Sequence, residues 1–408
     1  SLHDALPICY HPLVFMAMGA VLLGFSSATQ DIVIDAYRIE SAAVDLQAMM
    51  ASAYIGGYRI GMLVAGAGAL IMAEWFGSAK GSYRFEAWQA TYCIMAGLMV
   101  VGMVTALVID EPDSDYNPAD AYSSKDYLSG LGLFCLAVAA FVMTFYFTGR
   151  ITLDVKAQLG QWLHNPTLAG LLVECFRLVT GLGAAALMGW GGMSAGLVNR
   201  QMVITSYVAP VMDFFKRYRV SAAWLILTLV GLYRISDIVL GVISNVFYQD
   251  LGFSKTQIAS VVKTFGLFMT LAGGFAGGML SIRYGVIRIL FLGALLASAT
   301  NLLFMVLAVA GHSLVLLYLV IAADNLAAGL ASAAFVAFLS SLTSVRFTAV
   351  QYAVFSSLMT LVPKVFGGYS GTIVDAAGYP AFFLLTTLMG LPVLLLVWYC
   401  SRHLDIDG

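Results

Sequence analysis

The sequence predicts an all-α protein that crosses a membrane many times, and three observations carry this prediction. Hydrophobic residues make up 61% of the 408 residues and charged residues 10%, whereas a soluble domain has about 25% charged residues. Eleven long apolar stretches follow one another, and an apolar stretch of about 18 residues or more is typical of a membrane-spanning helix. Five of the twenty Lys and Arg residues lie inside these stretches. Charges so placed are costly unless they line a polar path or pair with one another, so the pattern favours a protein that moves a polar molecule.

The composition argues against several other classes of protein. A net charge of −2 gives no sign of nucleic-acid binding. The five cysteines and five histidines are dispersed, and no Cys-x-x-Cys or Cys/His cluster indicates a disulfide framework or a zinc site. No Ser/His/Asp arrangement and no glycine-rich phosphate loop is visible. We therefore expect no enzyme activity, no metal and no cofactor.

The eleven spans can be placed in order by their apolar lengths. They cover residues 12–35, 48–73, 88–109, 127–150, 168–195, 221–248, 255–280, 287–310, 314–341, 348–374 and 379–402. Several end at turn-forming glycines, among them Gly252, Gly311 and Gly378. Of the two longest polar interruptions, residues 110–126 are acidic, and residues 196–220 are basic and partly amphipathic. The second predicts a linker that lies on a membrane surface.

The loops predict an orientation, because Lys and Arg gather on the cytoplasmic side of membrane proteins. If the first span leaves the membrane on the cytoplasmic side at Arg38, ten cations lie in cytoplasmic loops and five lie outside. The cytoplasmic set is Arg38, Lys125, Arg200, Lys216, Arg217, Arg219, Arg283, Arg288, Arg346 and Arg402. The outside set is Lys80, Arg84, Arg150, Lys156 and Lys255. This asymmetry favours a cytoplasmic end for the first span.

Four cations are predicted to lie deep in the membrane, roughly 12–24 Å from the starts of their spans at about 1.5 Å per residue. They are Arg59, Arg234, Lys263 and Lys364. Asp324, followed by Asn325, lies at a similar depth. Such residues need a partner on another helix or an aqueous cavity. The fifth cation, Arg177, follows Glu174 by three residues, and we interpret that pair as structural.

The densest polar cluster lies at the end of the first span. Asp31, Asp35 and Arg38 occupy positions i, i+4 and i+7, so a helix places them on one face, with Gln30 one face over. One interpretation is a carboxylate that takes up and releases a proton beside an Arg partner, since desolvation moves carboxylate titration toward neutral pH. The other is a cap near the cytoplasmic end of the helix, where charges cost little.

Later spans contain polar pairs with two interpretations. Asp237 follows Tyr233 and Arg234 closely, so an Arg–Asp pair can neutralise itself, or Arg234 can bind an anionic group that Asp237 helps to orient. The tyrosines can stack on sugar rings or pack between helices. The candidate substrate-binding residues are Gln30, Tyr58, Arg59, Tyr233, Arg234, Asp237, Lys263, Asp324, Asn325, Gln351, Tyr352 and Lys364. Asp31 is the first candidate for proton coupling and Asp35 the second.

Residues 278–288, GMLSIRYGVIR, resemble the Gly-x-Leu-x-Asp-Arg-x-Gly loop between two spans of the major facilitator superfamily. Ile282 stands where that pattern has Asp. The resemblance implies a gating loop that docks on neighbouring helix ends in one state and releases in the other. Its candidate residues are Gly278, Arg283, Gly285 and Arg288.

A more specific resemblance covers nearly the whole chain. Residues 28–40, ATQDIVIDAYRIE, and 57–63, GYRIGML, are similar to the AmpG muropeptide permease family, and residues 232–237, LYRISD, extend the match. The resemblance implies a proton-coupled importer of N-acetylglucosaminyl-1,6-anhydro-N-acetylmuramyl peptides across the bacterial inner membrane, serving wall recycling and β-lactamase induction. We expect the protein to be a monomer whose partners are the substrate, protons and the lipid bilayer. The alternatives are a transporter of another polar anion, such as acetyl-coenzyme A, and a non-transporting membrane sensor.

The resemblance also implies a division of the chain. Family members carry three spans before the ATQD segment, so the fold expected is a major facilitator bundle of about eleven spans with three N-terminal spans missing. Residues 1–11 are then a non-native leader or artefact, and 12–109 the remainder of the N-terminal bundle. Residues 110–220 are an inter-bundle region with two extra spans and the basic linker, and 221–408 a six-span C-terminal bundle. A chain lacking these three spans is not expected to transport by itself, because such transporters build their site between two bundles.

Overall fold

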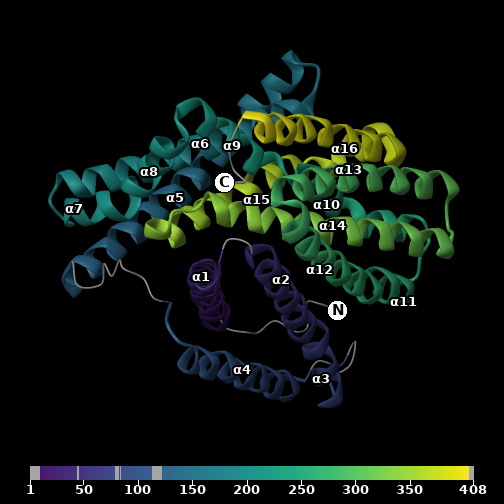
Figure 1. Cartoon of the computed structure of the whole chain (residues 1–408), viewed down its shortest axis with the longest axis horizontal. Helices are drawn as coiled ribbons and strands as arrows, with labels where there is room; N and C mark the ends of the chain where they lie inside the picture. Colours follow the sequence, from purple (N-terminus) through teal and green to yellow (C-terminus); the bar gives the residue numbers. More distant parts are fainter. Residues whose placement is uncertain (1–9, 44–45, 79–81, 83, 113–121, 404–408) are drawn as a thin grey trace.

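The computed structural model describes residues 10–43, 46–78, 82, 84–112 and 122–403 (Figure 1). These residues form long helices and no β-strand. The α-helices are α1 (Tyr10–Glu40), α2 (Gln47–Leu63), α3 (Ala69–Trp75), α4 (Phe85–Val108), α5 (Ser124–Trp162), α6 (Pro166–Ser194), α7 (Arg200–Val203), α8 (Ala209–Tyr218), α9 (Val220–Leu232), α10 (Ile235–Asp250), α11 (Lys255–Gln257), α12 (Gly266–Tyr284), α13 (Val286–Ala310), α14 (Leu314–Leu342), α15 (Thr348–Gly367) and α16 (Ser370–His403). Three π-helical segments, η2 (Val64–Gly68), η4 (Ile204–Val208) and η5 (Ile258–Phe265), and the 3₁₀ turn η6 (Val345–Phe347) join some of them.

Ten helical stretches in the described part of the chain are long and apolar enough to cross a membrane. They match the second to eleventh expected spans, which confirms the all-helical polytopic class. The first expected span falls in α1, a 31-residue helix that is not among the ten. Two expected boundaries were wrong. α5 continues to Trp162 rather than ending near residue 150, and α15 ends at Gly367, so residues 370–374 belong to α16.

The last six spans pack into the best-buried part of the molecule, because small residues let their helices approach closely. A Cβ atom on Gly273 of α12 would collide with the Leu326 carbonyl of α14, and one on Gly329 of α14 would collide with the Thr270 carbonyl of α12. Close packing of small residues is the usual basis of helix association in membranes. Phe247, Phe304 and Phe383 fill the centre of this bundle with fully buried rings. These six spans supply most of the residues that line a polar cavity on the side of α2.

Helices α5 and α6 form an antiparallel hairpin at the edge of the molecule (Figure 1). Ser123 and Asp126 make a reciprocal capping box at the start of α5, and Asn165 caps α6 just before its first-position proline. Such caps satisfy the free N–H groups of a helix start. The hairpin matches the two extra spans expected between residues 110 and 220.

The basic segment after α6 forms the short helices α7, η4 and α8. In α8, Pro210 and Phe214 are buried, whereas the charged residues Lys216 and Arg217 lie in its last turn. Arg217 pairs with Asp213 at 2.9 Å and donates to the Leu342 carbonyl at 3.0 Å. The segment therefore docks on the C-terminal bundle, whereas its amphipathic pattern predicts a linker that lies on the membrane surface.

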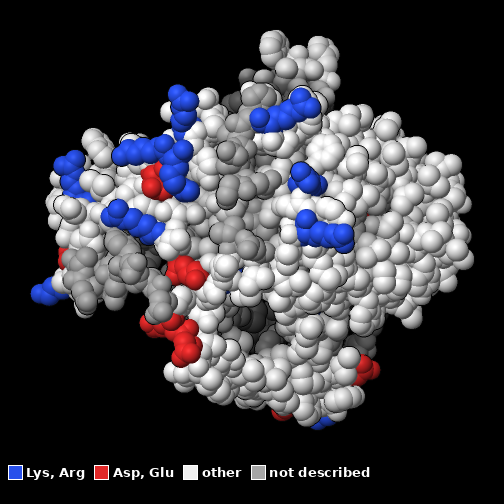
Figure 2. All heavy atoms as spheres, in the orientation of Figure 1, with Lys and Arg blue, Asp and Glu red and all other residues white. Residues whose placement is uncertain are grey.

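The N-terminal helices α1 to α4 lie together on one side of the remaining helices (Figure 1). Helix α2 joins the two parts by packing on α12 and α14. Its Ser52 hydroxyl donates to the Gly274 carbonyl at 2.7 Å, and Ala51 beside it is fully buried. Figure 2 shows a hollow between the N-terminal helices and the rest of the molecule. The halves thus meet along α2 and where α1 contacts α15, and they enclose space elsewhere.

Candidate functional site: a polar cavity between the two helical halves

A cavity of about 530 Å³ lies between α2 and the C-terminal helices. Its polar lining residues are Arg59 from α2, Ser244, Asn245 and Tyr248 from α10, Lys263 from η5, Thr270 from α12, and Asp324 and Asn325 from α14. Four of them, Arg59, Lys263, Asp324 and Asn325, are candidates that the sequence suggested. Residues from both halves of the chain therefore converge on one space, and its size lies within the range of small-molecule sites, about 300–1,000 Å³.

The carboxylate and amide of α14 are held by neighbouring hydroxyls. Thr270 donates to the Asn325 amide oxygen at 2.8 Å, and the Asn325 amide nitrogen donates to the Ile321 carbonyl at 3.0 Å. The Thr300 hydroxyl lies 3.4 Å from the Asp324 carboxylate. These bonds fix both side chains, which lowers the entropic cost of binding a ligand.

The two cavity cations differ in setting. Arg59 is half-buried and Lys263 is exposed to the cavity. Lys263 belongs to the π-helical segment Ile258–Phe265, and such segments are frequent at functional sites. With Asp324 as the one lining carboxylate, the cavity has one positive charge in excess. An anion, or a zwitterion with more than one acidic group, therefore fits it better than a cation does.

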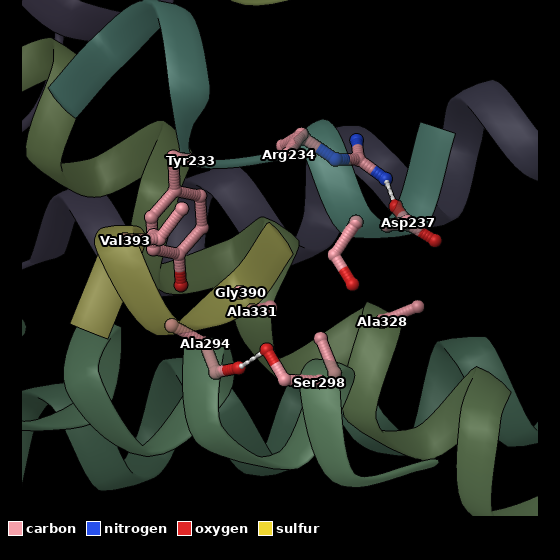
Figure 3. A pocket seen from close by; sticks show the side chains of 11 residues that line it. Tyr233, Arg234, Asp237, Ala294, Ser298, Ala328, Ala331, Gly390 and Val393 are labelled. Carbon is pink, nitrogen blue, oxygen red and sulfur yellow. Dashed lines mark hydrogen bonds and ion pairs between the residues drawn. The ribbon is translucent and has the colours of Figure 1, made fainter. Parts of the chain in front are cut away.

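Beside this cavity, Arg234 and Asp237 form an ion pair at the start of α10 (Figure 3). Asp237 interacts electrostatically with both Arg59 and Asp324, so the pair belongs to the same polar region. A second, small cavity of about 20 Å³ lies beneath it, which is room for roughly one water molecule. Each side chain of this pair thus has an oppositely charged partner on its own helix.

Tyr233 turns away from Arg234 in Figure 3. Its hydroxyl donates to the Leu290 carbonyl at 2.9 Å, and its ring stacks on Phe335 with centroids 4.3 Å apart. The side chain is 6% exposed. The structure gives this tyrosine a packing role within the C-terminal bundle.

A second polar cluster lies where α1 meets α15. Arg38 is 3% exposed and Asp35 9% exposed, and their charged groups are 3.6 Å apart. The Arg38 guanidinium lies 5.3 Å from the Tyr352 ring and 5.8 Å from the Tyr54 ring. Cations over aromatic faces are attracted electrostatically. This cluster joins the N-terminal half to the C-terminal half.

The turn after α1 supports this cluster. Gln47 accepts from Arg38 at 3.4 Å and donates to the Ile39 and Ala42 carbonyls at 2.9 Å each. The turn is thereby tied to the buried guanidinium. Arg38 and Gln47 were not among the sequence candidates, although Arg38 had been considered as the partner of a carboxylate.

Several candidates lie away from the cavity. Gln30 lines a different, largely apolar groove between α1 and α4, and Asp31 is exposed on α1. Tyr58 is 59% exposed, and Lys364 is exposed near the end of α15. Gln351 is occupied in the contact with α8, where it accepts from Arg217 at 2.9 Å and donates to the Pro210 carbonyl at 2.8 Å.

The candidate gating loop joins α12 to α13. Gly285 has a φ of 87° between the two helices, a backbone conformation that glycine adopts without strain. Arg283 and Arg288 are exposed on either side of it. Gly278 faces α2, because a Cβ atom there would lie 3.1 Å from the Ala48 carbonyl. The loop therefore comes a few residues after the contact between α12 and α2, which joins the two halves.

Sequence reasoning missed the α10 contribution to the cavity. Gly241, Ser244, Asn245 and Tyr248 lie at positions i, i+3, i+4 and i+7 of one helix, so they form one small and polar stripe. That periodicity was the available signal. No group of three His, Cys, Asp or Glu side chains able to hold a metal occurs among the residues that the structure describes.

The chain resembles known transporters. The family model described as Major Facilitator Superfamily matches residues 226–405. A transporter named AmpG 4 from Rickettsia conorii is 27% identical over 386 residues, which cover 95% of this chain and 72% of that protein. The anhydromuropeptide permease of Escherichia coli K12 is 26% identical over 395 residues, which cover 96% of this chain and 61% of the permease. The chain therefore spans less than two thirds of that permease's length.

Among solved structures, the human organic anion transporter MFSD10 (TETRAN) matches 95% of this chain and 91% of its own, with 16% identity and a TM-score of 0.40. A likeness at that score carries no argument about function. The relatives named AmpG, by contrast, cover nearly the whole chain, and the superfamily model and the ten apolar helices agree with them. Along nearly its whole length, the chain resembles the AmpG transporters of the Major Facilitator Superfamily.

Proposed function

We propose that this protein imports N-acetylglucosaminyl-1,6-anhydro-N-acetylmuramyl peptides across the bacterial inner membrane, driven by protons, for peptidoglycan recycling. The observation that carries the proposal is the cavity in which Arg59 and Lys263, from different halves of the chain, stand beside Asp324 and Asn325. The substrate offers matching groups, because its peptide carries carboxylates and its sugars carry hydroxyls and amides. The name of the Escherichia coli relative adds support for the substrate class.

Alternating access follows from the placement of the contacts. In the orientation that the loops predict, the cavity residues lie toward the outer ends of their helices, as with Lys263 near the start of its span. The contacts between the halves, at Arg38 and Ser52, lie toward the cytoplasmic ends. This arrangement is that of a transporter open to the outside and closed to the cytoplasm. Release of the cytoplasmic contacts lets the two halves rock about the cavity.

The proton-coupling carboxylate is proposed to be Asp35 or Asp31 of α1. Asp35 is buried against Arg38 at the contact between the halves, so its protonation weakens that ion pair and frees the contact. Asp31, one turn earlier on the same helix, is exposed. We propose a monomer as the transporting unit, in which the protein's partners are substrate, protons and the lipid bilayer.

The test is uptake of labelled anhydromuropeptide by cells that lack their own permease. The chain is expressed alone and joined behind the three N-terminal spans of a close AmpG relative, and labelled acetyl-coenzyme A is supplied in parallel. We expect accumulation of muropeptide, and not of the thioester, in cells with the joined chain. Accumulation of the thioester alone supports the rival anion transporter. Transport of neither compound by any version, despite expression in the membrane, contradicts the importer and supports a sensor.

A further inference from the structure

The α5–α6 hairpin has an open apolar groove that the proposed transport function does not use. The groove has a volume of about 530 Å³. It is lined by Leu133, Leu136, Ala140, Ala184, Leu187, Met188, Gly191, Gly192 and Leu197. At roughly 30 Å³ for a group the size of a water molecule, this volume accommodates about one fatty-acyl chain. The groove lies on a span of the membrane-crossing hairpin, so acyl chains are its natural neighbours.

Two adjacent glycines shape the groove. A Cβ atom on Gly191 would meet nothing within 4 Å, whereas one on Gly192 would collide with the Leu133 side chain. Leu133 thus packs against α6 and forms the floor, and Gly191 leaves the space above it open. Leu136 and Leu187 on the walls are 51% and 66% exposed. The groove is therefore shaped by the absence of a side chain at Gly191 and by the close contact of Gly192 with Leu133.

Two cations stand at one end of this groove. Lys125 lies in the first turn of α5, and Arg200 begins α7, three residues after Leu197. The Met202 side chain of α7 packs against Gly130 of α5, where an added Cβ atom would lie 2.5 Å from it, and this contact brings the two helix starts together. Lys125 and Leu136 are eleven residues apart on one helix, close to three full turns, so they lie near the same face.

Both cations are available to a ligand. Their side chains are exposed, and neither forms an ion pair with another residue in the described ranges. The nearby Asp126 carboxylate accepts from the Ser123 backbone at 3.0 Å and hydroxyl at 2.8 Å, as part of the helix cap. Figure 2 shows Lys and Arg side chains gathered over the region of α5 to α8. This end of the hairpin therefore attracts anions.

We propose that the groove and its two cations form a binding site for one anionic phospholipid of the cytoplasmic leaflet. The acyl chain occupies the groove between α5 and α6, and Lys125 and Arg200 bind the phosphate headgroup. The predicted orientation places both cations on the cytoplasmic side, where basic pockets between membrane helices bind anionic headgroups. The site is separate from the transport cavity and stands whether or not muropeptide is the substrate.

Native mass spectrometry of the purified chain tests the headgroup part of the proposal. Phosphatidylglycerol and phosphatidylethanolamine with identical acyl chains are titrated in parallel, and we expect tighter binding of the anionic lipid. The double variant Lys125→Gln/Arg200→Gln is expected to lose about fivefold in affinity for phosphatidylglycerol per cation removed. The control Arg346→Gln/Arg402→Gln removes two exposed cations elsewhere on the predicted cytoplasmic side and is expected to bind as wild type does.

A second pair of variants tests the groove. Gly191→Leu fills the open space and is expected to lower the affinity for both lipids. Gly189→Leu, two residues away on a different face of α6 and equally free of neighbours within 4 Å, is the matched control and is expected to change neither. Equal affinity of wild type for the two headgroups, or equal losses in test and control variants, indicates annular lipid only and overturns the proposal. The headgroup comparison needs no variant, so it decides the matter even if a variant does not fold.

Discussion

Two lysines that look alike in the sequence differ in the structure. The sequence places Lys263 and Lys364 deep in apolar spans, each without a carboxylate within one helical turn, but in the structure Lys364 lies in the last turn of α15. In the structure, Lys263 lines the cavity beside Asn325, whereas Lys364 is exposed and is not among the lining residues. The partner of a deep charge lies on another helix, so residue spacing alone does not reveal which lysine meets the substrate path.

We predict that Lys263→Gln weakens binding of anhydromuropeptide by about ten- to a hundredfold, because a hydrogen bond to a charged group contributes about 1.5–3 kcal/mol. Arg59→Gln is expected to have an effect of the same size. Binding is measured by isothermal titration with the purified protein. Lys364→Gln is the control and is expected to bind as wild type does. An equal loss in Lys364→Gln means that the cavity is not the binding site.

The two candidate carboxylates of α1 also differ. Asp35 is buried with Arg38, and Asp31 is exposed. We predict that Asp35→Asn abolishes uptake driven by a pH gradient but preserves exchange of labelled for unlabelled substrate, because only the proton-linked step is lost. Proteoliposomes with and without an imposed gradient separate the two activities. Asp31→Asn is run beside it, and gradient-driven uptake at the wild-type level in both variants excludes α1 as the site of proton coupling.

Residue types and depth in a span were enough to nominate half of the polar residues that line the cavity. Arg59, Lys263, Asp324 and Asn325 were found because charges and amides are rare in membrane helices and need a reason to be there. Tyr233 and Gln351 were nominated by the same reasoning but are held by packing and by the α8 contact. Whether a polar side chain hydrogen-bonds to the protein itself or is free to bind a ligand depends on its neighbours in the tertiary structure.

At the scale of elements, apolar length predicted ten of the spans, because a helix must match the thickness of the bilayer. The end of α5 was missed because residues 151–162 mix polar and apolar types and fall outside the apolar run. α8 was expected only as a surface linker, since its buried contacts with the C-terminal bundle come from folding rather than from its own sequence. Where a helix ends outside the bilayer depends on its capping residues and on the helices that pack against it.

The close contact of α12 with α14 gives a prediction at this scale. Gly329→Ala adds a Cβ atom that collides with the Thr270 carbonyl, so we expect the unfolding free energy to fall by about 1–3 kcal/mol. Gly371→Ala, whose Cβ would meet nothing within 4 Å, is the control. Thermal unfolding in detergent measures both. A Gly329→Ala protein as stable as the control contradicts the close approach of these helices.

For the whole molecule, the two halves touch at one end and enclose the cavity toward the other. In a cysteine-free background, Asn245→Cys in the cavity is expected to react with a membrane-impermeant maleimide applied from outside the cell. Ser52→Cys, at the buried contact with α12, is expected to be protected. This experiment tests both the orientation of the chain and the side on which the cavity opens. Rapid labelling of position 52 together with protection of position 245 would mean that the cavity opens to the cytoplasm instead.

The central claim is that cations of the cavity bind the carboxylates of a muropeptide during import. A double comparison tests it most directly, with anhydromuropeptide and its carboxyl-amidated analogue supplied to the joined chain and to its Lys263→Gln variant. The account predicts that amidation lowers uptake strongly in the wild type and much less in the variant, because both changes remove the same interaction. The contrary result is that amidation lowers uptake by the same factor in the Lys263→Gln variant as in the wild type. That result would show that Lys263 does not meet the substrate carboxylates, and it would contradict the account.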